Sequence, residues 1–96
     1  MATASWNGTM IAQADNAQVQ LVDNNVYFPQ ACVNMDYLQA STHTSVCGWK
    51  GTASYYDVVV DGKVNFNAAW IYRDPLPDAR NIAGHLAFWK GVNVER

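Results

Sequence analysis

The segment 46–56 holds the densest group of side chains that could do chemistry. Cys47 could act as a nucleophile, because a nearby ammonium group lowers the pKa of a thiol. Lys50 could bind an anionic group while Trp49 stacks on a planar one. The alternative is a loop between two strands, in which Trp49 fills a corner of the core and Lys50 is solvated. For Cys47 the alternative is a small buried hydrophobic residue.

A second group of aromatic and basic residues follows later in the chain. Trp70 and Tyr72 have the same parity in a predicted strand and therefore share one of its faces. Trp89-Lys90 repeats the pairing of Trp49-Lys50. If these segments meet, they form an aromatic cleft with two ammonium groups, which suits a small planar or anionic ligand. The alternative is that the aromatic residues form the core. The predicted ligand-binding residues are Trp49, Lys50, Tyr55, Trp70, Tyr72, Trp89 and Lys90.

Three residues are candidates for catalysis in the same cleft. Cys47 would serve a thiol mechanism, while His43 or Asp36 would serve acid–base chemistry, since a histidine titrates near neutral pH. The chain contains no G-x-S-x-G elbow, Walker loop or G-x-G-x-x-G fingerprint. The sequence therefore leaves three functions open: a ligand-binding domain, a small enzyme, and a structural or protein-interaction module.

Composition and charge exclude several classes of protein. Hydrophobic residues make up 50% of the chain, which excludes a disordered protein. Six basic residues against eight acidic ones give a net charge of −2, so we expect no nucleic-acid partner. No apolar run approaches the ~18–20 residues that span a bilayer, so we expect no membrane segment. The N-terminus lacks the pattern of a signal peptide, which favours a cytoplasmic location.

The cysteine and histidine residues do not have the spacing of metal ligands. Cys32 and Cys47 are two lone thiols, and His43 and His85 form no H-x₃-H motif, so we expect neither a metal nor a cofactor. A disulfide between the two cysteines is not expected in a reducing cytosol.

Turn-forming residues divide the chain into short β-branched and aromatic segments. These turn formers are Asn7-Gly8, Asp15-Asn16, Asp23-Asn24-Asn25 and Asp61-Gly62. Strands are predicted at 9–12, 19–22, 53–60, 63–66, 69–72, 85–89 and 92–94, with 53–66 as a hairpin. Two short helices are predicted at 34–38, capped by Asn34, and at 74–82, capped by Asp74 with Pro75 in the first turn. The expected fold is a single all-β domain over residues 1–96.

Four ordered blocks resemble the domain of unknown function family 427, over about residues 6–94. They are Tyr27-Phe28-Pro29, residues 47–56, residues 68–72 and residues 87–92. The resemblance implies a β-rich domain of the β-tent type, similar to the fold of methionine-R-sulfoxide reductases. A nucleotidyltransferase label is attached to this family, but the chain lacks a Gly-Ser pair followed by Asp-x-Asp, and we set that activity aside. The paired C-x-x-C motifs of β-tent proteins are also missing, so the resemblance adds no zinc site.

Overall fold

Three hairpins end in two-residue turns at positions that the sequence predicts. Asn7-Gly8, Asp23-Asn24 and Asp61-Gly62 have positive φ at both residues. This is the backbone of a type I′ turn, whose twist matches that of the strands it joins. The turn predicted at Asp15 is also present, where the Gln18 N–H donates to the Asp15 carbonyl over 2.9 Å. Local turn chemistry therefore fixes where the chain reverses.

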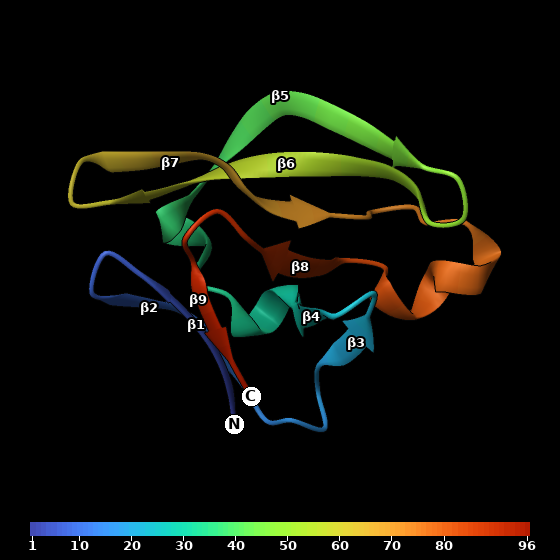
Figure 1. Cartoon of the computed structure of the whole chain (residues 1–96), viewed down its shortest axis with the longest axis horizontal. Helices are drawn as coiled ribbons and strands as arrows, with labels where there is room; N and C mark the ends of the chain where they lie inside the picture. Colours follow the sequence, from blue (N-terminus) through green and yellow to red (C-terminus); the bar gives the residue numbers. More distant parts are fainter.

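The computed structural model describes residues 1–96 and is mostly strand (Figure 1). This confirms the predicted all-β class. The strands are β1 (Ala2–Trp6), β2 (Thr9–Ala14), β3 (Gln20–Val22), β4 (Asn25–Pro29), β5 (Leu38–Cys47), β6 (Gly51–Val60), β7 (Lys63–Ile71), β8 (His85–Phe88) and β9 (Asn93–Glu95). Three short 3-10 helices are η1 (Gln30–Cys32), η2 (Met35–Tyr37) and η3 (Pro77–Ile82).

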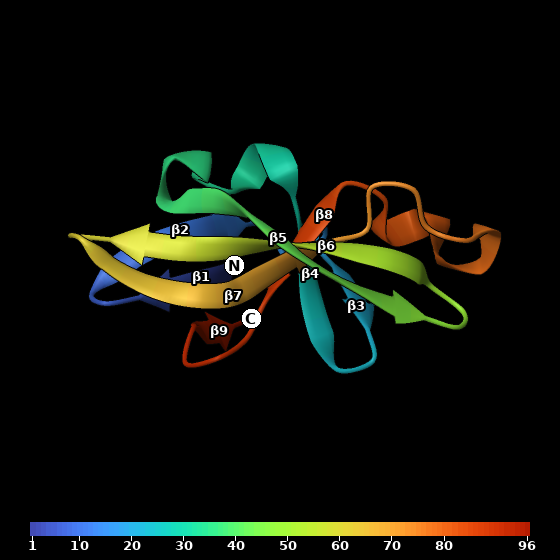
Figure 2. The same cartoon turned by 90° about the horizontal axis from the view of Figure 1, so that it is seen from above.

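The strands form two antiparallel sheets. One sheet has the order β2-β1-β9, and the other has the order β3-β4-β8-β7-β6-β5. Figure 1 shows β1, β2 and β9 lying across from one end of the long β6–β7 hairpin, with β3 and η3 at the other end. From above, β5, β6 and β7 cross one another as strongly twisted strands (Figure 2). The similarity to the β-tent type stays a prediction.

The central strands place alternate side chains in two separate hydrophobic clusters. In β4, Phe28 belongs to the main core between the two sheets, while Tyr27 belongs to a second cluster on the opposite face. In β7, Ile71 and Trp70 divide in the same way. This follows from the two-residue period of a strand. The second cluster, covered in part by Ile82 of η3, is the aromatic side of the molecule.

Of the two predicted helix N-caps, the structure confirms one and contradicts the other. Asn34 caps η2 as predicted, because its side chain accepts from the Asp36 N–H over 3.1 Å. The prediction for 74–82 was wrong at its start: the N-cap is Leu76, with Pro77 in the first turn, instead of Asp74 with Pro75. Leu76 is held extended because it precedes a proline and because its N–H donates to the Lys50 carbonyl over 2.9 Å.

The sequence did not predict β1, β4 or the ten-residue strand β5. In β5 the middle residues are polar and exposed, so no apolar alternation marks it. Its strand geometry comes from pairing with β6 on both sides of a register shift at residues 41–43. Leu38 to Ala40 lie opposite Val58 to Tyr56, and Thr44 to Cys47 lie opposite Ser54 to Gly51. Since it is the edge of the six-stranded sheet, one side of its backbone has no partner strand.

Replacing Gly51 by alanine is expected to lower the free energy of unfolding by about 1–3 kcal/mol. Gly51 has φ +106°, and a Cβ there would lie 3.4 Å from the Leu76 nitrogen. Gly48→Ala is the control, because nothing lies within 4 Å of its Cβ position and its φ is not in the left-handed region. Urea unfolding of the two variants measures the difference. Equal effects at both positions would contradict the strain assigned to Gly51.

Candidate functional site

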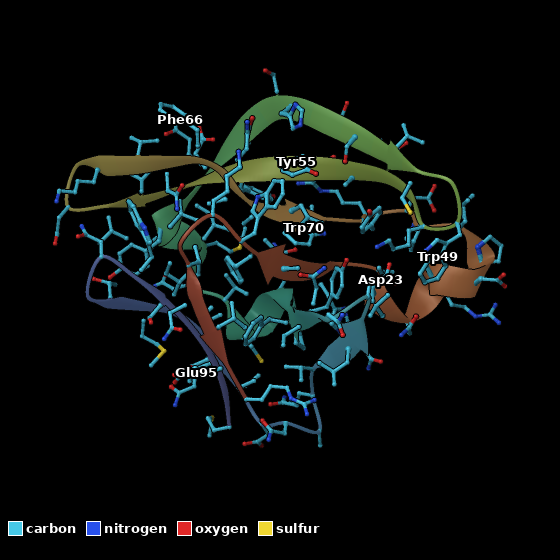
Figure 3. All side chains as sticks on the ribbon, in the orientation of Figure 1. Asp23, Trp49, Tyr55, Phe66, Trp70 and Glu95 are labelled. Carbon is cyan, nitrogen blue, oxygen red and sulfur yellow. The ribbon has the colours of Figure 1, made fainter.

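A hollow of about 240 Å³ opens beside the second hydrophobic cluster. We call it the aromatic hollow, and it is lined by Asn25, Lys50, Tyr55, Trp70, Tyr72 and Trp89. These residues belong to β4, to the turn between β5 and β6, to β6 and β7, and to the segments that follow β7 and β8. Figure 3 shows Tyr55 and Trp70 close together near the middle of the molecule.

Strand register brings three rings of the hollow together. Tyr55 of β6 pairs with Trp70 of β7, and Trp70 pairs with Ala87 of β8. Trp89 follows Ala87 by two residues. The Tyr55 ring centroid lies 6.5 Å from each indole, and the two indoles are 5.7 Å apart at 76°. These are spacings of attractive aromatic contacts, so the rings support one another.

Hydrogen bonds to the protein orient all three rings. Trp89 Nε1 donates to the Asn67 carbonyl over 2.6 Å, and Trp70 Nε1 donates to the Tyr27 hydroxyl over 3.2 Å. The Tyr55 hydroxyl and Ser45 Oγ are 2.9 Å apart, and either can donate. Because the protein already uses their polar atoms, the rings offer apolar surface to a ligand.

Lys50 supplies a positive charge that one carboxylate neutralises. Its side chain is buried, and its Nζ lies 2.7 Å from Asp23 Oδ2 and 5.7 Å from the centroid of the Tyr72 ring. Burial acts to lower the pKa of Lys50, but the hydrogen bond to Asp23 and the tyrosines Tyr27 and Tyr72 outweigh it, so the pKa is raised. Lys50 is therefore protonated at neutral pH. Since an ammonium carries three N–H groups, donors remain beyond the one that Asp23 accepts.

The Tyr72 hydroxyl is one of the hydrogen-bonding groups of the hollow that the protein leaves free. Tyr72 is 5% exposed, and its hydroxyl bonds to no protein group. No fully buried side-chain oxygen or nitrogen lacks a partner, so this hydroxyl must be accessible, and the space it reaches is the hollow that Tyr72 lines. Burial raises the pKa of Tyr72. At neutral pH the group is an uncharged phenol that can donate to a ligand.

The structure brings five of the seven predicted ligand-binding residues to this hollow: Lys50, Tyr55, Trp70, Tyr72 and Trp89. Trp49 instead borders a separate depression with Leu76 and Pro77 beside η3, at the far end of the β5–β6 hairpin (Figure 3). Lys90 does not line the hollow, but its Nζ lies 5.0 Å from the centroid of the Trp89 ring. A role of any of these residues in binding stays a prediction.

Sequence reasoning missed Asp23 and Asn25. Both belong to a stretch that the sequence assigned only to a turn, and Asp23 meets Lys50 across 27 positions of the chain. The positive φ of Asp23, which the turn requires, explains the residue type without any site. No local signal distinguishes a turn aspartate from one that also neutralises a buried lysine.

The three candidate catalytic residues lie apart from one another. Asp36 is exposed in η2 beside the start of β5, and Cys47 is the last residue of that strand. Nine strand steps of about 3.3 Å separate the two ends, which is on the order of 30 Å for a straight strand, so these two groups do not share a site. His43 is exposed in the middle of β5, with its ring 4.6 Å from that of Tyr55. No three His, Cys, Asp or Glu side chains gather as metal ligands do.

Cys47 has a local reason for reactivity. The backbone N–H groups of Trp49 and Lys50, and then the charge of Lys50, lower the pKa of its thiol. In a Cys32→Ser variant, alkylation of Cys47 by iodoacetamide should reach half its maximal rate at a lower pH than alkylation of free cysteine, because the thiolate is the reacting form. A midpoint at or above that of free cysteine would contradict the stabilising role of the turn.

The comparisons with known proteins concern the whole chain. The model of a family described as "Domain of unknown function (DUF427)" matches residues 1–96. This confirms the resemblance seen in the sequence and extends it to both ends. A search of curated proteins gives no match. Among the helices, none has the length and apolar character needed to cross a membrane.

Proposed function

For a chain that belongs to the DUF427 family, we propose binding of a small planar or anionic ligand in the aromatic hollow. The observation that carries this proposal is the convergence of three rings, one buried ammonium and one free hydroxyl on the same space. Binding sites for small molecules combine mainly apolar walls with a few polar groups in the same way.

The volume of the hollow limits the size of the ligand. At about 240 Å³ it lies below the range of roughly 300–1,000 Å³ that holds drug-sized molecules. One ring, or two fused rings, fits this space better than an extended molecule. In the proposed complex, Trp70 and Trp89 contact the faces or edges of the ring, while Lys50 and Tyr72 donate hydrogen bonds to its polar edge.

The test compares two tryptophans with the same local sequence. Trp49 and Trp89 both occur in Trp-Lys-Gly and are 43% and 46% exposed, but only Trp89 lines the hollow. A set of planar metabolites, neutral and anionic, is screened by thermal shift, and the affinity of each ligand found is then measured. Trp89→Ala should weaken binding about tenfold or more through lost ring contact, while Trp49→Ala changes it less than about twofold.

Lys50→Ala is the second variant, because it removes the buried ammonium and should also weaken binding. Circular dichroism of each variant establishes that the fold is retained. The proposed site would be contradicted if no metabolite of the set shifted the thermal unfolding of the protein. It would also be contradicted if Trp49→Ala and Trp89→Ala lost ligand affinity equally.

A further inference from the structure

The Asp23–Lys50 pair carries an inference about the charge of the ligand, which rests on the proposed function. We propose that Asp23 sets the specificity of the aromatic hollow: the hollow takes an uncharged planar ligand with a hydrogen-bond acceptor at its edge, in preference to the carboxylate analogue. Asp23 would act on the ligand through Lys50, as a specificity-determining residue outside the walls of the hollow.

The Asp23 carboxylate lies next to the Lys50 ammonium group. Asp23 Oδ2 lies 2.7 Å from Lys50 Nζ, at the length of a charge-assisted hydrogen bond. Lys50 is held in turn by its buried stem and by its position over the Tyr72 ring. Asp23 is fixed by the type I′ turn, in which its φ is +52°. The pair is therefore built into the fold from two separate hairpins.

An anionic ligand at Lys50 would meet the Asp23 carboxylate as well as the ammonium group. A ligand carboxylate bonded to the same ammonium would place its oxygen about 4–5 Å from that of Asp23, given the usual length of such bonds. At this separation the repulsion between the two anions offsets much of the attraction to Lys50. Asp23 is 54% exposed on its side chain and needs no charged ligand to complete its environment.

A cationic ligand in the hollow would meet the ammonium groups of Lys50 and Lys90. Two of the four rings that line the hollow already have ammonium neighbours: Lys50 Nζ is 5.7 Å from the Tyr72 ring centroid, and Lys90 Nζ is 5.0 Å from that of Trp89. A cationic ligand would be repelled by both lysines. A neutral acceptor, in contrast, can bond to the remaining N–H groups of Lys50 and to the free Tyr72 hydroxyl.

Two matched pairs of probes test this inference: benzamide with benzoate, and indole-3-carboxamide with indole-3-carboxylate. Each pair keeps the ring and changes only the charge. Binding is followed by NMR through the indole N–H signals of Trp70 and Trp89. The unmodified chain should bind each amide at least fivefold more tightly than its acid. Asp23→Asn should tighten binding of the acids about tenfold and leave the amides within twofold.

Asp61→Asn is the matched control. Asp61 is also the first residue of a type I′ turn, with φ +51°, and it is not in the hollow. Asp61→Asn removes the same formal charge as Asp23→Asn. Comparing the two variants therefore separates the local effect of Asp23 from the effect of a change in net charge. Asp61→Asn should leave the amide-to-acid ratio unchanged.

The outcomes separate the two proposals. If the unmodified chain binds acids as tightly as amides at Trp70 and Trp89, or if Asp23→Asn leaves the ratio unchanged, the role of Asp23 is overturned while the binding site stands. If none of the four probes shifts the Trp70 and Trp89 signals, the proposed function fails, and this inference fails with it. If Asp23→Asn does not fold, the ratio of amide affinity to acid affinity on the unmodified chain tests the inference. A ratio below fivefold then overturns it.

Discussion

Replacing Phe28 by alanine should lower the free energy of unfolding by about 3–5 kcal/mol, the usual cost of removing a large buried side chain. Phe28 is fully buried in the main core, and its ring lies 5.8 Å from that of Phe88. A domain of this size has a total stability of roughly 5–15 kcal/mol, so this variant would lose a large part of it.

Phe66→Ala is the control for Phe28→Ala. Phe66 lies on β7 with its side chain on the outer surface (Figure 3), and it is 67% exposed. Its loss should change the stability by no more than about 0.5 kcal/mol. Unfolding in urea, followed by circular dichroism, measures both variants. Similar losses for the two phenylalanines would mean that the main core is not where the structure places it.

Trp70→Ala should have the largest combined effect on stability and binding. Trp70 is 8% exposed, and it is the indole that joins the buried cluster to the hollow, through Tyr27 on one side and Trp89 on the other. We expect a loss of about 3–5 kcal/mol in unfolding free energy. Ligand binding should disappear, because the ring that separates the hollow from the core is gone.

Trp70→Phe separates the two effects. Phenylalanine keeps a ring in the cluster but removes the indole N–H that donates to the Tyr27 hydroxyl. The stability loss should fall to about 1–3 kcal/mol, while binding stays weakened. Urea unfolding gives the first quantity, and titration with a ligand from the screen gives the second. Full binding by Trp70→Ala would contradict a wall role for this residue.

Much of the fold could be predicted because its turns are local. Asn7-Gly8 and Asp61-Gly62 specify type I′ turns by residue type alone, and the segments that follow each pair are strands as predicted. β5 could not be predicted in this way. Its middle residues are exposed and polar. It is a strand because β6 pairs with the residues on both sides of them, which is a property of the neighbour.

The site shows the same division between local and long-range information. Strand parity predicted that Trp70 and Tyr72 share a face, and both belong to the second cluster. Local sequence could not separate Trp49 from Trp89, since both stand in Trp-Lys-Gly. Trp89 follows β8 in the middle of the sheet, whereas Trp49 lies in the turn after the edge strand β5. The order of the strands, which no local pattern encodes, determines which of the two reaches the hollow.

A crystallographic screen with small planar fragments tests the central claim most directly. The aromatic hollow is the proposed binding site, so fragment density should gather between Trp70 and Trp89, with a polar atom within hydrogen-bond distance of Lys50 or of the Tyr72 hydroxyl. Density gathered instead in the depression beside Trp49 and Leu76, or an aromatic hollow that stays empty across the screen, would contradict the account.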